Sequence, residues 1–145
     1  MFLLGTDIAA TDTSQARQQQ LQSGWGFTCS CPLCRASPEQ ITASDGRREQ
    51  LSNGVHRMVA ALQKGDVAEA VSILRTALQN LEEEGLEALS GEVYEGLARI
   101  HWAVGDKATA RQLARTSIEY RASFGPVLEP TDRRAALEGL ISGFE

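Results

Sequence analysis

The chain has 145 residues, enough for one domain or for a small domain with an appendage. Nineteen acidic residues outnumber fourteen basic ones. The resulting net charge of −5, with no basic stripe in the sequence, argues against direct binding to nucleic acid. Apolar residues make up 42% of the chain, which is typical of a globular protein. No apolar run approaches the roughly 18 residues of a membrane span, so we expect no contact with a membrane.

The N-terminal third of the sequence predicts little regular structure. Thr13 or Ser14 can cap a short helix, and Gly24 can end it. Residues 25–34 lack a helical period and predict an irregular loop. Small and turn-forming residues dominate the stretch over 37–46, which therefore predicts a linker.

From residue 47 to the end, apolar residues recur at helical spacing. They form five stripes, at 51–62, 67–81, 89–104, 113–124 and 137–144. We therefore expect a mainly α fold, with an array of about five helices that follows the irregular cysteine-containing segment.

An internal repeat accompanies these stripes. The Gly65-Asp66 pair and the Gly105-Asp106 pair lie 40 residues apart, and two alanines follow each pair at matching positions. Glycine suits the left-handed position that ends a helix, and aspartate can cap the next helix. The unit resembles a tetratricopeptide-type helical hairpin, although the usual offset is about 34 residues. A plain helical bundle with a chance repeat is the alternative.

The three cysteines of the chain, Cys29, Cys31 and Cys34, all lie within six residues. An odd and clustered set does not fit a disulfide framework, and it favours a reducing intracellular compartment, the cytoplasm or the nucleus. Zinc binds thiolates in a tetrahedron, so three closely spaced sulfurs predict a zinc site with one corner open. A fourth ligand from outside the chain or a water molecule can fill that corner. Three reduced cysteines without metal are the other interpretation.

The two histidines of the chain are weak candidates for the fourth ligand. His56 and His101 both fall in predicted helices of the C-terminal region. His101 lies beside Trp102 on a mostly apolar helix, which favours a packed or half-exposed histidine. We expect the same of His56.

The cysteines belong to a longer motif, Trp25-Gly26-Phe27-Thr28-Cys29-Ser30-Cys31-Pro32-Leu33-Cys34. This block resembles the end of the SET domain and the post-SET loop of SET-domain protein lysine methyltransferases, above all those of the SMYD and fungal SET type. In that family a helical, tetratricopeptide-like region follows, as it does in this sequence. The resemblance implies that Cys29, Cys31 and Cys34 are zinc ligands, with a fourth cysteine supplied by an Asn-His-Ser-Cys motif of the SET core. It also implies that Phe27 packs against the adenine of S-adenosylmethionine. Hydrophobic support for the loop is the alternative for Phe27 and Trp25.

The sequence also departs from the family. It contains no SET core and no Asn-His-Ser-Cys motif, and Ala10 stands where relatives carry a channel tyrosine. No tyrosine occurs before Tyr94. Methyl transfer to a lysine amine needs a cofactor pocket and a means of keeping the amine neutral, and neither is recognisable.

These observations predict a truncated or degenerate SET-domain protein without methyltransferase activity of its own. It would comprise a SET remnant with its post-SET loop (1–36), a linker (37–46) and a tetratricopeptide-like helical domain (47–145). The helical surface would bind a protein or peptide. The alternative is one part of an active S-adenosylmethionine-dependent protein lysine methyltransferase whose SET core lies outside this chain.

Overall fold

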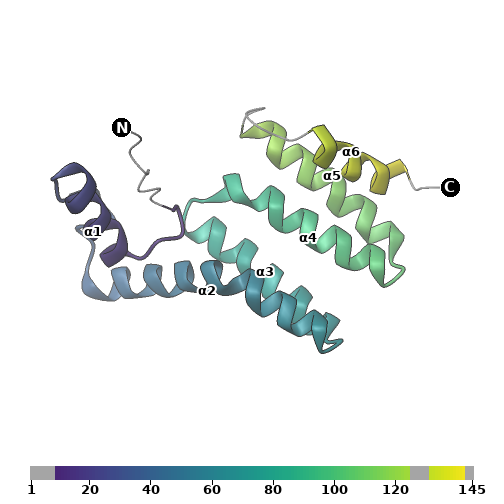
Figure 1. The fold of residues 1–145 in the computed structure, drawn as a ribbon, viewed down its shortest axis with the longest axis horizontal. Coiled ribbons are helices and arrows are strands. Elements are labelled where there is room, and N and C mark those ends of the chain that lie inside the picture. The colour runs from purple at the N-terminus through teal and green to yellow at the C-terminus, as the bar shows by residue number, and fades with distance from the viewer. Residues whose placement is uncertain (1–8, 125–130, 143–145) are drawn as a thin grey trace. The chain divides into compact units, whose positions relative to one another are not determined.

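The computed structural model describes the backbone of residues 9–124 and 131–142, and the side chains of all these except 131–134. Every regular element in this part of the chain is helical, which confirms the predicted mainly α fold class. The elements are α1 (Ser14–Trp25), α2 (Pro38–Gln63), α3 (Val67–Glu83), the 3-10 turn η1 (Glu87–Leu89), α4 (Ser90–Ala103), α5 (Lys107–Ser123) and α6 (Thr131–Ser142) (Figure 1). They divide into two compact units, one up to Val55 and one from His56 onward.

The short first helix has the predicted N-terminus. The Thr13 side chain accepts a hydrogen bond from the Ala16 N–H, as an N-cap residue does. The helix ends at Trp25 and not at the predicted Gly24, because Gly26 is the capping residue that takes the left-handed conformation, with φ of 71°. The chain from Gly26 to Ser37 is irregular, which agrees with the loop predicted over 25–34 except at Trp25, the last residue of α1.

The linker predicted over 37–46 was wrong, because α2 begins at Pro38. Ser37 and Gln40 form a reciprocal capping box: the Gln40 N–H donates to the Ser37 hydroxyl at 3.3 Å, and the Ser37 N–H donates to the Gln40 side chain at 3.1 Å. Pro38 fills the first helical position, where its missing N–H costs nothing. The small residues that suggested a linker therefore include a helix start signal.

Polar contacts hold the N-terminal unit together. The Ser14 N–H donates to the Asp45 carboxylate at 2.6 Å, and the Arg48 guanidinium donates to the Ala10 carbonyl oxygen. Arg48 and Ser44 are buried, whereas none of the apolar side chains described in this unit is. The described residues of this unit thus show no apolar core of the kind that usually stabilises so small a structure.

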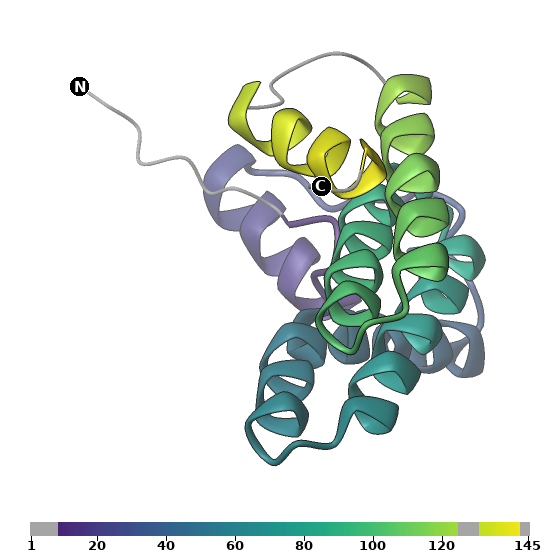
Figure 2. The ribbon, with the colours of Figure 1, turned by 90° about the vertical axis from the view of Figure 1, so that its right-hand side faces the viewer.

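The C-terminal unit has a continuous apolar core. One cluster joins the end of α2 to α3 and α4, and its buried members are Ala61, Ala70, Ile73, Leu74, Leu97 and Ile100. A second cluster joins α4 and α5 to α6, and its buried members are Ala98, Ala114, Leu137 and Leu140. Leu113 packs against both clusters. Figures 1 and 2 show α4 and α5 as an antiparallel pair with α6 alongside.

The two Gly-Asp turns have nearly the same geometry, as the internal repeat predicts. Gly65 and Gly105 have φ values of 76° and 86°. Asp66 and Asp106 each donate a backbone N–H to the carbonyl five residues earlier, at 2.9 Å in both turns. Each aspartate side chain then accepts the N–H three residues later, at 2.9 and 3.2 Å. Both turns are therefore Schellman motifs followed directly by a capped helix.

The pairing of α4 with α5 depends on small residues and on one buried carboxylate. A Cβ atom at Gly91 would lie 2.7 Å from the Arg121 Cγ, so glycine permits the close approach there. The Ser117 hydroxyl donates to the Gly91 carbonyl at 2.7 Å. Glu95, buried on α4, accepts from Arg121 of α5 at 2.7 Å and from Arg99 of its own helix at 2.8 Å.

Several predicted core positions are exposed in the structure. Val59 and Leu62 of the first apolar stripe keep 41% and 38% of their surface accessible, while their neighbour Ala61 is buried. Val104 and Phe124, at the ends of later stripes, are also exposed. Phe144 lies outside the described residues. Ala61 belongs to the first core cluster with Ala70, Ile73 and Leu74 of α3, so the end of α2 turns this small residue, and not Val59 or Leu62, toward the core.

Candidate metal centre

The cysteine loop is attached to α1 by one glutamine. The Gln18 side chain donates its amide N–H to the Cys29 carbonyl at 2.8 Å and accepts the Cys29 N–H at 2.9 Å. These two hydrogen bonds satisfy both backbone groups of Cys29 and fix the point where the loop leaves the helix. Sequence reasoning missed Gln18, because a glutamine in a polar helix carries no pattern that distinguishes it from its neighbours.

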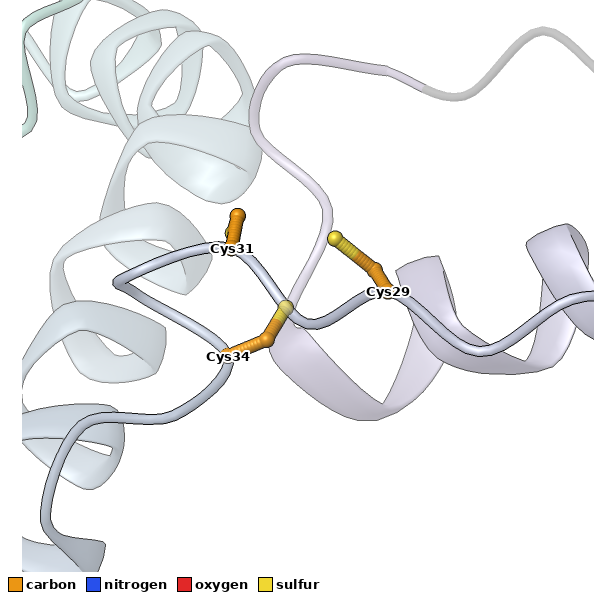
Figure 3. A group of neighbouring side chains, drawn as sticks. All are labelled: Cys29, Cys31 and Cys34. Atoms are coloured by element: carbon orange, nitrogen blue, oxygen red, sulfur yellow. The ribbon is translucent and has the colours of Figure 1, made fainter.

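A tight turn brings the remaining two cysteines toward the first. The Arg35 N–H donates to the Cys31 carbonyl at 3.0 Å, and the Ala36 N–H donates to the Leu33 carbonyl at 3.2 Å. The Sγ atoms of Cys29, Cys31 and Cys34 all lie within 4.8 Å of one another (Figure 3). All three thiols are free, so the loop contains no disulfide.

The turn makes the three sulfurs chemically unequal. Hydrogen bonds lower the pKa of Cys31 to about 7; the largest contribution comes from the backbone N–H of Cys34, and the thiols of Cys29 and Cys34 add to it. Burial, followed by the neighbouring thiols, raises the pKa of Cys34. Cys31 is exposed and is therefore the sulfur best suited to be a thiolate near neutral pH.

The donor set fits a thiophilic metal ion. Zinc–thiolate bonds of about 2.3 Å in a tetrahedron place the sulfurs roughly 3.8 Å apart, so the sulfurs here need to approach by only about 1 Å. No histidine or carboxylate completes the group among the described side chains. His101 instead pairs with Asp106 at 3.1 Å, and His56 is an exposed residue of α2 in the other unit. The three cysteines can therefore hold a metal ion and leave one position for another ligand.

The two aromatic residues before the cysteines project from the loop. Trp25 is 69% exposed and Phe27 is 49% exposed, so neither ring forms a closed apolar core beneath the loop. The predicted stacking of Phe27 on adenine stays a prediction.

Comparison with protein-family models, with curated proteins and with solved structures gave no match. Among the described helices, none is both long enough and apolar enough to cross a bilayer.

Proposed function

We propose that this chain is the post-SET and helical part of a degenerate SET-type protein, and that it acts as an interaction module with a structural zinc site. Cys29, Cys31 and Cys34 would hold the zinc, and the helical array from α2 to α6 would bind a protein or peptide. The proximity of the three Sγ atoms, within 4.8 Å of one another, carries the proposal. Zinc is favoured among metals because it takes thiolate ligands in a tetrahedral set.

The N-terminal unit supplies a second line of support. Its described apolar side chains are not buried, and the contacts of Ser14 and Ala10 with the first part of α2 are polar. Where the described residues bury so little apolar surface, a bound metal can supply much of the stability, since the free energy of metal binding then becomes free energy of folding. Reduced cysteines also suit the reducing conditions of the cytoplasm or nucleus, where we propose that the protein acts.

Zinc titration tests the metal site. At saturating zinc we expect one ion per chain, bound more weakly than in a four-ligand site because three thiolates lack a fourth protein partner. Cys29→Ser, Cys31→Ser and Cys34→Ser should each abolish this binding, whereas His56→Ala and His101→Ala should leave it unchanged. Metal content after gel filtration gives the stoichiometry. Unchanged zinc binding in Cys31→Ser would overturn the proposal.

The alternative function is a contribution to methyl transfer, with a SET core supplied outside this chain. The exposure of Phe27 favours it, because a half-exposed ring can receive a flat purine. Calorimetric titration with S-adenosylmethionine separates the two functions. An interaction module predicts no heat of binding, and micromolar binding that Phe27→Ala removes would favour the methyltransferase.

A further inference from the structure

A hollow of about 310 Å³ lies among α3, η1, α4 and α5, within the C-terminal unit. Leu78 and the two tyrosines of the chain, Tyr94 and Tyr120, form part of its wall. Glu82 and Glu87 add two carboxylates to the same wall. Aromatic rings and acidic groups therefore converge on one concave surface.

The tyrosine rings are arranged as a short aromatic row. The centroids of Tyr94 and Tyr120 lie 5.2 Å apart with the ring planes tilted by 40°. Phe124 continues the row 6.4 Å beyond Tyr120 and is 56% exposed. Burial raises the pKa of Tyr94, and the charges of Tyr120 and Glu82 add to the effect. The negative potential of Glu82 thus reaches the ring of Tyr94.

The acidic groups of the hollow have no cationic neighbour in its wall. The other lining residues are neutral. Within the described part of the chain, neither Glu82 nor Glu87 forms an ion pair. An aromatic surface with uncompensated carboxylates attracts a cation, since the ring faces and the carboxylates are both negative.

We propose that this hollow binds an arginine side chain of a basic peptide. A guanidinium group stacks on tyrosine faces, donates hydrogen bonds to carboxylates in pairs and is more weakly hydrated than an ammonium group. The net charge of −5 on the whole chain complements such a partner at longer range. The proposal rests on the interaction function proposed above and adds the chemical class of the partner.

The test is a nuclear magnetic resonance titration of the full chain with the peptide acetyl-Gly-Ser-Arg-Ser-Gly-amide. The same peptide with citrulline in place of arginine has nearly the same shape without the charge. We expect the arginine peptide to shift the ring resonances of Tyr94 and Tyr120, and the citrulline peptide to bind at least about fivefold more weakly. Raising the salt concentration should weaken the binding of the arginine peptide only.

Two variants separate the hollow from the rest of the acidic surface. Glu82→Gln combined with Glu87→Gln should weaken arginine-peptide binding by about fivefold or more, since both carboxylates lose their charge. Glu119→Gln removes an exposed carboxylate of α5 outside the hollow and should leave the affinity unchanged. The proposal would be overturned if the citrulline peptide bound as tightly as the arginine peptide. It would also be overturned if Glu119→Gln weakened arginine-peptide binding as much as the double variant does. Zinc content measured on the same samples reports on the metal site separately, so failure of one proposal is distinguishable from failure of the other.

Discussion

Cys31 shows how a short turn changes the chemistry of one side chain. Cys29 lies two positions before it and Cys34 three positions after it. Their thiols and the backbone N–H of Cys34 donate hydrogen bonds to the Cys31 sulfur. Because these donors stabilise the thiolate, the pKa of Cys31 falls to about 7. Cys34 shows the opposite change, because burial disfavours its charged form.

This difference predicts unequal reactivity in metal-free protein. We expect alkylation of Cys31 by iodoacetamide to rise with a midpoint near pH 7, since the thiolate is the reacting species. The midpoint for Cys34 should lie above that of an ordinary thiol, because its pKa is raised. Tandem mass spectrometry of the modified peptide assigns each site. Alkylation of Cys34 as fast as that of Cys31 at neutral pH would contradict the prediction.

Gln18 illustrates the limit of sequence reasoning at the same scale. The cysteine spacing identified the three sulfurs, because thiolates this close in the chain can reach one ion from a single tight loop. The residue that anchors the loop lies eleven positions before Cys29 and became evident only from its paired hydrogen bonds.

At the scale of elements, the α4–α5 pair is fixed by a buried ion pair as well as by small residues. The Glu95 carboxylate accepts from Arg121 at 2.7 Å, and the side chains are only 9% and 13% exposed. The second partner of Glu95, Arg99, is 54% exposed. The Glu95–Arg121 pair between the helices should therefore contribute more to the free energy of unfolding than the Glu95–Arg99 pair within α4.

Glu95→Ala tests this difference. The substitution removes the carboxylate that pairs with the buried Arg121 guanidinium, so we expect the free energy of unfolding to fall by about 3–5 kcal/mol. Arg99→Ala removes an exposed partner of the same carboxylate and should cost about 1 kcal/mol or less. Urea unfolding followed by circular dichroism measures both. Similar decreases in the free energy of unfolding of the two variants would show that the interhelical pair contributes no more than the pair within α4.

At the scale of the whole molecule, the two units differ in what stabilises them. Both apolar clusters lie after His56. The described residues before His56 are held together by polar contacts and include the cysteine loop. Burial of apolar surface is the dominant favourable term in folding. The C-terminal unit can therefore be stable by itself, whereas the described part of the N-terminal unit has no apolar cluster to stabilise it.

The fragment 47–145 should fold without the residues that precede it. It contains every buried member of both clusters, so we expect strong helical circular dichroism and a cooperative thermal transition. A shorter fragment, 1–55, serves as the comparison and should show little cooperative unfolding without zinc. A fragment 47–145 with no helical signal would contradict the prediction.

Removal of metal from the full chain should affect only the first unit. With a chelator present, we expect the Arg35 N–H, which donates to the Cys31 carbonyl, to lose its protection from hydrogen exchange. The Asp106 N–H in the second Gly-Asp turn should keep its protection, since the apolar core holds that turn in place. Nuclear magnetic resonance resolves the two amides. Equal loss of hydrogen-exchange protection at both amides would show that the two units are energetically coupled.

The helical class, the two matching Gly-Asp turns and the cysteine cluster could all be predicted from the amino-acid sequence. Each depends on interactions between residues close in the chain, such as caps, left-handed glycines and neighbouring ligands, so each leaves a local pattern. Even the missed start of α2 had such a signal in Ser37, Pro38 and Gln40.

The buried faces of the helices and the side chains that meet across them became evident only from the packing of the helices. Ala61 is buried while the larger Val59 and Leu62 are not, because Ala61 is the residue that joins the cluster shared with α3 and α4. Glu95 and Arg121 are 26 positions apart, and the tyrosine hollow draws on four separate elements. Such contacts arise from the packing of one helix on another, and the periodicity of any single helix carries no information about its partner.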